Sequence, residues 1–238
     1  MNIIQPYARM MPGPTRAARG ETEFCAEEGD ELLKYVEWRA RVSHRSEDAD
    51  PDTRRFLSSV VGHHGDWSVT EHASVSVDFY VDRGITHELV RHRLFAITQE
   101  STRFVNYEKK MPPSFVCPFP EDERKFTMVP PDTELTAYDE WRGAIGASES
   151  AYRNLVRRGV SPQIARSVFP NSLASRIIIT GNLRNWRHVF LMRTTREAHP
   201  QMREVTIPLL AEFQAKIPIF YDDIEPMARQ VDNLKKGR

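Results

Sequence analysis

Apolar residues recur along this chain with two different periods, and the points where the period changes divide it into helices and strands. In residues 30–42 they recur every three to four positions, which predicts an amphipathic helix. Residues 52–62 follow the same period and end at Gly62, which is typical of a helix end. The first part of the chain is therefore predicted to be helical, apart from residues 1–20, which are rich in Pro, Gly and Arg and which we expect to form an irregular N-terminal arm.

The period then falls to two in residues 73–81, where apolar side chains alternate with serine, aspartate and tyrosine. The apolar positions are Val75, Val77, Phe79 and Val81. Strict alternation of this kind predicts a strand with one buried face. A turn at residues 82–84 leads into residues 85–93, for which we expect a short helix.

Prolines interrupt the middle of the chain around Cys117. Six of them lie between residues 112 and 131: Pro112, Pro113, Pro118, Pro120, Pro130 and Pro131. A segment without periodicity is more typical of a lid or a surface insertion than of a core element. Residues 132–158 then predict a long polar helix that ends at Gly159.

The remaining patterns combine helices with one buried strand. Ser161 and Pro162 are typical of the N-cap and first turn of a short helix. Residues 176–180 (RIIIT) predict a buried strand, and Asn182 is the predicted N-cap of a helix reaching about residue 193. A final helix is expected at residues 197–216. Together these elements predict an α+β fold, and 238 residues suit a single domain spanning 1–238.

Composition limits the possible functions. The 33 basic and 33 acidic side chains balance, which disfavours a general nucleic-acid binder with a basic face. We find neither an apolar run long enough to span a membrane nor the apolar core of a signal peptide. Cys25 and Cys117 are the two cysteines, too few for a disulfide framework. We therefore expect a cytoplasmic protein.

Against this neutral background, one segment gathers positive charge. Arg91, His92 and Arg93 are followed by seven residues and then by Ser101, with Arg103 just beyond. Guanidinium groups placed this closely repel one another unless an anion lies among them, and their planar donors suit phosphate or carboxylate. The segment therefore predicts an anion-binding site; the alternative is a solvated basic helix end whose arginines pair with scattered acids.

Several familiar chemistries are excluded by the motifs that the sequence lacks. It contains neither of the standard glycine-rich phosphate loops and no G-x-S-x-G elbow around Ser101. His87 and His92 are five positions apart, which places them about 140° apart on a helix instead of on one face, so we expect no metal site there.

A second candidate anion-binding site lies at the start of the predicted helix after Asn182. The free N–H groups at a helix N-terminus suit an anionic ligand, and Arg184 and His188 share one face of this helix. Arg193 lies nine positions beyond Arg184, so it is expected on the opposite side, where it could touch a second ligand or a neighbouring subunit. The alternative is that these side chains face solvent. An arginine-rich site of this kind suits an anionic cofactor that performs the chemistry itself.

The residues that carry these features resemble a known family. Arg91-His92-Arg93-x7-Ser101 resembles the RHRx7S motif of the flavin-dependent thymidylate synthase (ThyX) family. Further stretches are similar to segments of that family in the same order: SVTEHA at 68–73, THEL at 86–89, ARSVFPN at 165–171, TGNLRNWRH at 180–188, MR at 192–193 and AHPQMR at 198–203.

The resemblance implies an activity and an assembly. The family converts dUMP to dTMP by reductive methylation, with 5,10-methylenetetrahydrofolate as carbon donor and with FAD that is reduced by NADPH. It implies a mixed fold of helices around a small sheet, assembled as a homotetramer whose active sites are shared between subunits. From the balanced charge and the lack of a long apolar run, we expect no nucleic-acid or membrane partner.

The resemblance also assigns roles by position. It implies FAD contacts at Ser68, Arg91, His92, Arg93, Gln99, Asn182, Arg184 and His188. It implies dUMP contacts at Glu88, Arg91, Gln99, Ser101, Arg103, Arg166 and Arg193. Arg193 is also the expected catalytic residue, because a guanidinium can stabilise negative charge developing on the uracil ring.

One position departs from the family pattern. Phe104 stands where the family usually has a tyrosine, so one nucleotide contact is missing and strict specificity for dUMP is in question. This leaves open a related flavoenzyme that methylates or hydroxymethylates another pyrimidine nucleotide. A more remote alternative is a non-catalytic nucleic-acid-binding protein.

Overall fold

The computed structural model describes residues 1–43, 45–46, 52–109, 111–119, 135–229 and 232. The chain groups into two compact units, which we describe separately. Unit 1 comprises residues 1–6, 80–89 and 99–177, and unit 2 comprises residues 7–79, 90–98 and 178–238. The expected single domain spanning 1–238 stays a prediction.

A four-stranded sheet begins in unit 2, with the strand order β2-β3-β6-β4. Its strands are β2 (Tyr7–Met11), β3 (Ser74–Asp82), β6 (Ala174–Asn182) and β4 (Ala96–Gln99). The Leu183 amide donates to the Ala73 carbonyl, and the hydroxyls of Ser76 and Thr180 lie 2.7 Å apart. Since residue numbers rise along one strand as they fall along the other, β3 and β6 run antiparallel.

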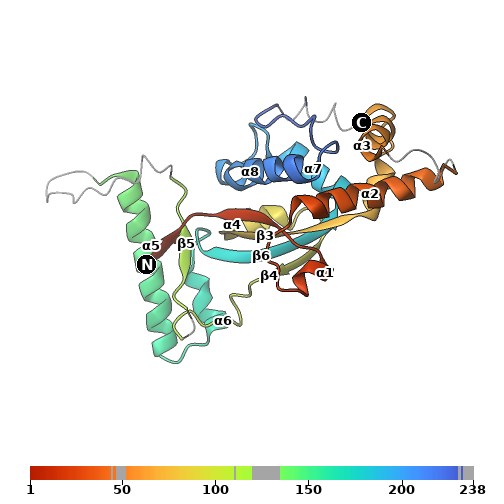
Figure 1. Cartoon of the computed structure of the whole chain (residues 1–238). Helices are drawn as coiled ribbons and strands as arrows, with labels where there is room; N and C mark the ends of the chain where they lie inside the picture. The colour runs from red at the N-terminus through yellow and green to blue at the C-terminus, as the bar shows by residue number, and fades with distance from the viewer. Residues whose placement is uncertain (44, 47–51, 110, 120–134, 230–231, 233–238) are drawn as a thin grey trace. The chain divides into compact units, whose positions relative to one another are not determined.

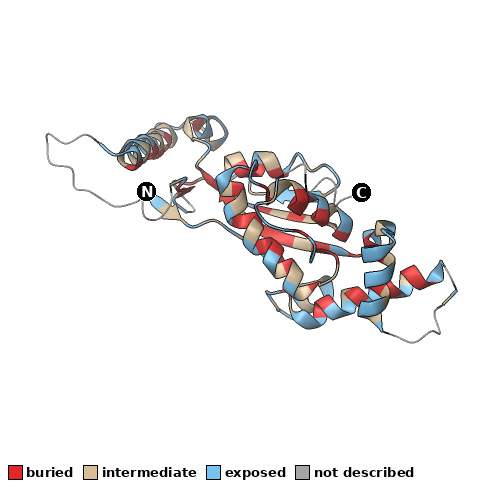
Figure 2. Ribbon diagram, turned by 90° about the horizontal axis from the view of Figure 1, so that it is seen from above, coloured by how far each residue is buried: buried red, intermediate tan, exposed pale blue. Residues whose placement is uncertain are grey.

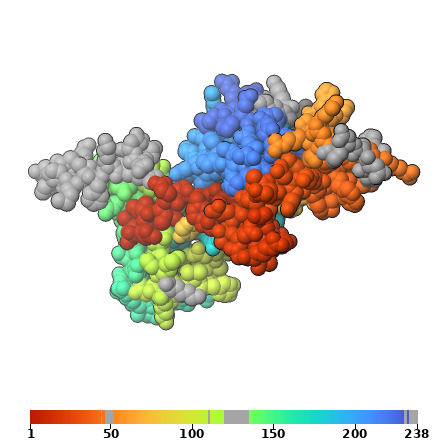
Figure 3. Space-filling model, viewed as in Figure 1, coloured from red at the N-terminus to blue at the C-terminus, as the bar shows by residue number. Residues whose placement is uncertain are grey.

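The three long helices of unit 2 are α2 (Ala26–Val42), α7 (Leu183–Arg193) and α8 (Pro200–Lys216). Shorter elements are α1 (Pro14–Ala17), α3 (Thr53–Leu57), the π-helix η1 (Ser58–His63) and the 3₁₀ helix η2 (Trp67–His72). Figure 1 shows α7 and α8 on the same side of β3 and β6, and α8 packs against β2, α7 and α2. In the space-filling view, the red N-terminal segment accordingly lies against the blue C-terminal helices (Figure 3).

Helix α2 shows why these residues form a helix. Leu33, Val36 and Ala40 are buried, whereas Lys34 and Trp38 are exposed, so burial follows the helical period (Figure 2). The Glu28 carboxylate accepts from the Cys25 amide, as in a capping box. The helix predicted at residues 30–42 is confirmed and begins four residues earlier.

Unit 1 contains the parallel strand pair β1 (Asn2–Ile4) and β5 (Ser114–Val116), in which Ile3 lies opposite Phe115. Its helices are α4 (Arg83–Leu89), α5 (Ala137–Arg157), α6 (Pro162–Ala165) and the 3₁₀ helix η4 (Arg166–Val168). Two buried clusters hold it together, one around Tyr107 and Tyr152 and the other around Phe115 and Leu173.

The alternation in residues 73–81 correctly predicted β3, whose Val75, Val77, Phe79 and Val81 are buried. The strand at 176–180 and the helix after Asn182 are also confirmed, and the Asn182 side chain accepts from the Asn185 amide at 2.8 Å. The mixture of helices and a small sheet confirms the predicted α+β class.

Three local predictions were wrong. The N-terminal arm contains the short helix α1 and the strands β1 and β2, whose hydrogen-bonding partners β5 and β3 lie far along the chain. The stretch around Cys117 includes the buried strand β5 and is not a surface loop within residues 111–119; residues 120–134 lie outside the described part. The helix expected at 85–93 runs instead from Arg83 to Leu89, since the Asp82 carboxylate accepts from the Ile85 amide at 2.9 Å and starts it earlier.

The other helices differ from prediction at their ends. The segment predicted at 52–62 forms α3 followed by the π-helix η1, the helix predicted at 132–158 is described from Ala137 to Arg157, and the last helix begins at Pro200. None of the helices that the structure describes is both long and apolar enough to cross a membrane.

A glycine in α2 gives a direct test of how this helix packs. A Cβ added at Gly29 would overlap the backbone carbonyl of Lys216 at the end of α8, whereas a Cβ at Gly146 in α5 would meet no described atom within 4 Å. We expect Gly29→Ala to lower the free energy of unfolding by about 1–3 kcal/mol. Gly146→Ala should raise it by roughly 0.5–1 kcal/mol, since alanine favours helix. Urea titration followed by circular dichroism measures both; equal stability of the two variants would contradict the close packing.

Candidate active site

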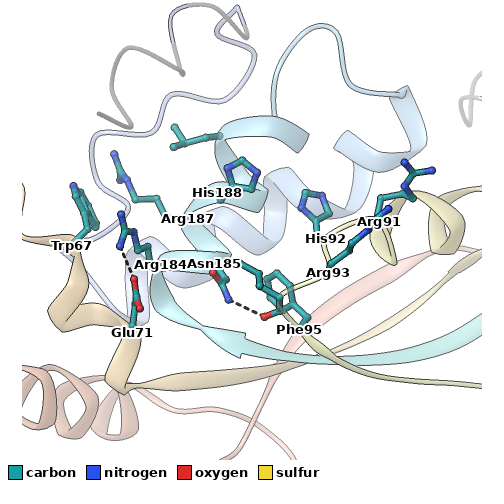
Figure 4. A pocket seen from close by; sticks show the side chains of 12 residues that line it. Trp67, Glu71, Arg91, His92, Arg93, Phe95, Arg184, Asn185, Arg187 and His188 are labelled. Atoms are coloured by element: carbon teal, nitrogen blue, oxygen red, sulfur yellow. Dashed lines mark hydrogen bonds and ion pairs between the residues drawn. The ribbon is translucent and has the colours of Figure 1, made fainter.

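A cavity of about 580 Å³ opens in unit 2, and three segments of the chain line it. The 3₁₀ helix η2, the loop between α4 and β4, and α7 each contribute side chains (Figure 4). The lining residues are Trp67, Glu71, Arg91, His92, Arg93, Leu94, Phe95, Arg184, Asn185, Arg187, His188 and Leu191. Four of these are arginines, so the cavity favours an anionic ligand.

The loop that carries Arg91, His92 and Arg93 is fixed against α7 by its neighbours. The side-chain nitrogen Nδ2 of Asn185 donates to the Leu94 carbonyl at 2.8 Å. The Phe95 ring meets the Trp186 ring edge to face, with 5.0 Å between their centroids. Gly181 allows this approach, because a Cβ there would overlap the Phe95 ring. These contacts present the basic loop to the same helix that carries the second arginine group.

Two residues predicted to function at the site bond directly to each other. The Arg193 Nε donates to His92 Nε2 at 3.0 Å, and the His92 and His188 rings lie 5.9 Å apart in an edge arrangement. Burial, followed by the charges of Arg193 and His188, lowers the pKa of His92 from 6.5 to about 4. At neutral pH His92 is therefore uncharged and can accept the Arg193 hydrogen bond.

Carboxylates partly balance the arginines of the cavity. Arg184 Nη1 lies 2.5 Å from Glu71 Oε1, where both side chains are about half exposed. Arg187 is buried and is paired by both of its terminal nitrogens with Asp223. Arg91 and Arg93 are also exposed and line the cavity. The guanidiniums of Arg91, Arg93 and Arg184 are therefore accessible to an anionic ligand.

Helix α7 presents one face to the cavity. Arg184, Arg187, His188 and Leu191 all line it and follow the helical spacing. The prediction that Arg184 and His188 share a face is confirmed. Arg193 lies outside the lining and reaches the site through its bond to His92.

Five further predicted residues lie in unit 1: Glu88, Gln99, Ser101, Arg103 and Arg166. Gln99 donates from its side-chain amide to the hydroxyls of Thr86 at 3.0 Å and Ser175 at 3.2 Å. Arg166 Nη1 donates to the Thr102 hydroxyl at 2.9 Å. The exposed guanidinium of Arg103 donates to Gln163 at 3.2 Å.

Glu88 and Ser101 also belong to unit 1. Glu88 is half-buried in α4, and the Ser101 hydroxyl accepts from the Arg103 amide at 3.3 Å. Ser101 therefore takes part in a turn, and this hydrogen bond of its hydroxyl involves no histidine or carboxylate that could activate it as a nucleophile.

The departure at Phe104 is visible in unit 1. Phe104 is 76% exposed, whereas the nearby Tyr107 is buried and its hydroxyl donates to Glu100 at 2.7 Å. Burial and this hydrogen bond raise the pKa of Tyr107 well above its usual range. Since the Tyr107 hydroxyl is already engaged, it does not replace the hydroxyl missing at Phe104.

The predicted site residues thus fall into two groups. Unit 2 holds Ser68, Arg91, His92, Arg93, Asn182, Arg184, His188 and Arg193, and unit 1 holds Glu88, Gln99, Ser101, Arg103 and Arg166. Ser68 is exposed on η2 and lies outside the cavity lining, and Asn182 caps α7. Within the described residues, no cluster of three or more His, Cys, Asp or Glu side chains could hold a metal ion.

Trp67, Glu71 and Arg187 line the cavity but were not predicted as site residues. Arg187 could have been found from the sequence, because it lies three positions beyond Arg184 on the same helical face. Trp67 and Glu71 come from a different segment, and only the tertiary contact with α7 brings them to the cavity.

Comparison with known proteins identifies the family. Residues 26–219 match the family model described as thymidylate synthase complementing protein. A flavin-dependent thymidylate synthase of Corynebacterium aurimucosum is 33% identical over 213 residues, which cover 85% of this chain and 83% of that protein. This chain belongs to the flavin-dependent thymidylate synthase family. As a member of it, the chain is a flavin-dependent enzyme of the methyltransferase class.

Further relatives agree. A flavin-dependent thymidylate synthase of Mycobacterium tuberculosis is 37% identical over 168 residues, covering 68% of this chain and 66% of that one. The fold resembles a UMP/dUMP methylase from Streptomyces cacaoi bound with 5-Br dUMP (TM-score 0.66, 22% identity, covering 93% and 96% of the two chains). It also resembles thymidylate synthase X from Helicobacter pylori with FAD and dUMP (TM-score 0.64, 18% identity, covering 81% and 93%).

The lowered pKa of His92 makes a prediction about pH. We expect the His92 ring to titrate near pH 4 instead of 6.5 in an NMR titration, with His92→Gln identifying its resonance. Because the unfolded state binds this proton more readily than the folded state, the contribution of neutral His92 to stability is complete above pH 6.5. It is lost as the pH falls from 6.5 towards 4. A midpoint near 6.5 would show that His92 is not held as a neutral acceptor.

Proposed function

We propose that this enzyme catalyses the reductive methylation of dUMP to dTMP, with FAD as its flavin, NADPH as reductant and 5,10-methylenetetrahydrofolate as carbon donor. The observation that carries the proposal is the arginine-lined cavity in which His92 holds Arg193. The named relatives support the reaction, and the donor chemistry of the cavity supports the cofactor.

The residues of the cavity fit a flavin dinucleotide. Its two phosphates are anionic, and Arg91, Arg93 and Arg184 offer planar donor forks suited to them. The imidazoles of His188 and His92 can bond to ring nitrogens or carbonyls, and the N-terminus of α7 behind its Asn182 cap favours negative charge. When bound, FAD would supply the hydride and mediate transfer of the one-carbon unit.

We assign dUMP contacts to the unit 1 residues Gln99, Ser101, Arg103 and Arg166, together with Glu88. The exposed guanidinium of Arg103 and that of Arg166 suit the nucleotide phosphate. Gln99 could read the uracil edge, since its side-chain amide carries both a donor and an acceptor. Ser68, which is exposed on η2, and Gln99 complete the set of proposed flavin contacts.

Arg193 is the proposed catalytic residue. Its Nε is engaged by His92, so the guanidinium has a fixed direction and its charge need not reorganise when negative charge develops on the uracil. The family resemblance further supports a homotetramer with shared active sites, working in the cytoplasm.

A second candidate reaction is methylation of UMP or another pyrimidine nucleotide. The exposed Phe104 favours it, because it lacks the hydroxyl that the family usually places there, and one structural relative is named a UMP/dUMP methylase. Turnover of dUMP and UMP should be compared in wild type and in Phe104→Tyr. We expect dUMP to be preferred, and the preference to increase in Phe104→Tyr; faster turnover of UMP by the wild type would favour the second candidate.

The main test concerns Arg193. Arg193→Lys keeps the positive charge but loses the planar fork, so we expect it to retain FAD and to form dTMP at least about 100-fold more slowly, a typical effect of losing one electrostatic stabiliser. Flavin absorbance and dTMP formation measured on the same sample separate binding from chemistry. Near-normal turnover would show that Arg193 is structural.

The matched control is the double variant Arg91→Ala/Arg93→Ala. It removes two exposed guanidiniums that line the cavity but leaves Arg193, so it should purify largely without flavin. Full flavin occupancy in the double variant would show that Arg91 and Arg93 of this cavity do not bind the flavin.

A further inference from the structure

Trp67 rests on a buried cation at one end of the cavity. The Arg187 guanidinium carbon lies 4.1 Å from the centre of the Trp67 ring, within the range of a cation–π contact. Arg187 is only 3% exposed, whereas Trp67 is partly exposed and lines the cavity. One side of the Trp67 ring is thus supported by the protein.

Arg187 is itself held in one orientation. Its Nη1 and Nη2 donate to the two carboxylate oxygens of Asp223, each at 2.6 Å, and Nη1 also donates to the Phe220 carbonyl at 2.7 Å. A bidentate pair fixes the plane of the guanidinium as well as its position. The plane of Arg187 therefore limits the positions that Trp67 can take.

The segment that carries Asp223 is anchored to the helices of unit 2. The buried Tyr221 donates from its hydroxyl to the Leu183 carbonyl at 3.0 Å, at the start of α7. Gln214 in α8 donates to the carbonyls of Tyr221 and Ile224 at 3.0 and 3.2 Å. The chain Asp223–Arg187–Trp67 is consequently built on fixed elements.

The position of Trp67 selects the part of a dinucleotide that it could meet. Figure 4 shows Trp67 with Glu71 and Arg184 at one end of the cavity and His92 with Arg91 at the other. His92 bonds to Arg193, the proposed catalytic residue, so the reacting ring belongs at that end. The opposite end, where Arg184 lies near Trp67, is left for the adenine and the adjoining phosphate.

We propose that Trp67 is the stacking platform for the adenine ring of FAD, and that Arg187 and Asp223 are positioning residues that hold this platform. The inference rests on the proposed function, because it takes the flavin dinucleotide as the ligand of the cavity. It further explains cofactor specificity, because an aromatic contact at Trp67 would favour FAD over flavins that lack adenine. Stacking of a base on an aromatic side chain contributes on the order of 10-fold or more in affinity.

The test compares ligands that differ in the adenine. The full chain, freed of flavin by dialysis and checked for an unchanged unfolding midpoint, is titrated with FAD, FMN and ADP. We expect Trp67→Ala to weaken FAD and ADP binding by on the order of 10-fold and to leave FMN binding unchanged. Asp223→Asn should shift FAD and ADP in the same direction by a smaller factor, because Arg187 loses one charged partner.

Two matched controls belong to the same unit. Trp38 is 58% exposed with Arg39 lying 5.2 Å from its ring, so Trp38→Ala removes a similar pair away from the cavity. Asp222→Asn changes the neighbouring carboxylate, which accepts from the Ile219 amide, whereas Arg187 pairs with Asp223. Neither control should change the preference for FAD over FMN.

A conservative variant keeps the inference testable if Trp67→Ala fails to fold. Trp67→Phe retains an aromatic ring, so it should bind FAD within about threefold of wild type but lose part of the tryptophan quenching that FAD causes. If Trp67→Ala weakens the binding of FAD and FMN equally, or weakens neither, Trp67 is not the adenine platform. The proposed function still holds in that case, provided that the wild type binds flavin. A wild-type chain that binds no flavin overturns both.

Discussion

The site of this enzyme depends on the packing of a single buried tryptophan. Trp186 donates from its indole nitrogen to the Val75 carbonyl at 2.9 Å, which ties α7 to the central strand β3. The same ring meets Phe79 on β3 and Phe95 at the end of the basic loop. Large buried aromatic contacts of this kind set the geometry of a core. One residue thus fixes the strand, the helix and the loop that together surround the cavity.

This packing lets one helix serve two purposes. On α7, Trp186, Val189 and Phe190 are buried, while Arg184 and His188 face the cavity. The helical period separates the two sets without any irregularity in the chain. Because its other face is buried in the core, α7 holds the guanidiniums of Arg184 and Arg187 in position through core packing.

Concentrating arginines in a cavity has an electrostatic cost, which the structure meets in two ways. Glu71 and Asp223 balance two of the guanidiniums, and His92 stays neutral through its burial and its positively charged neighbours. A protonated His92 would repel Arg193, whereas the neutral ring accepts its hydrogen bond. The remaining positive charge is available to an anionic ligand.

The sequence by itself determined the elements whose signals are local: the alternation of β3, the Asn182 cap of α7 and the shared face of Arg184 and His188. Tertiary structure decided the rest. The basic motif lies outside α4, which ends at Leu89, in a loop whose Phe95 packs on Trp186. Residues 2–4 and 7–11 form strands because their partners lie far along the chain. The contacts of Arg187 with Trp67 and Asp223 join three distant segments, and no local period encodes contacts over such separations.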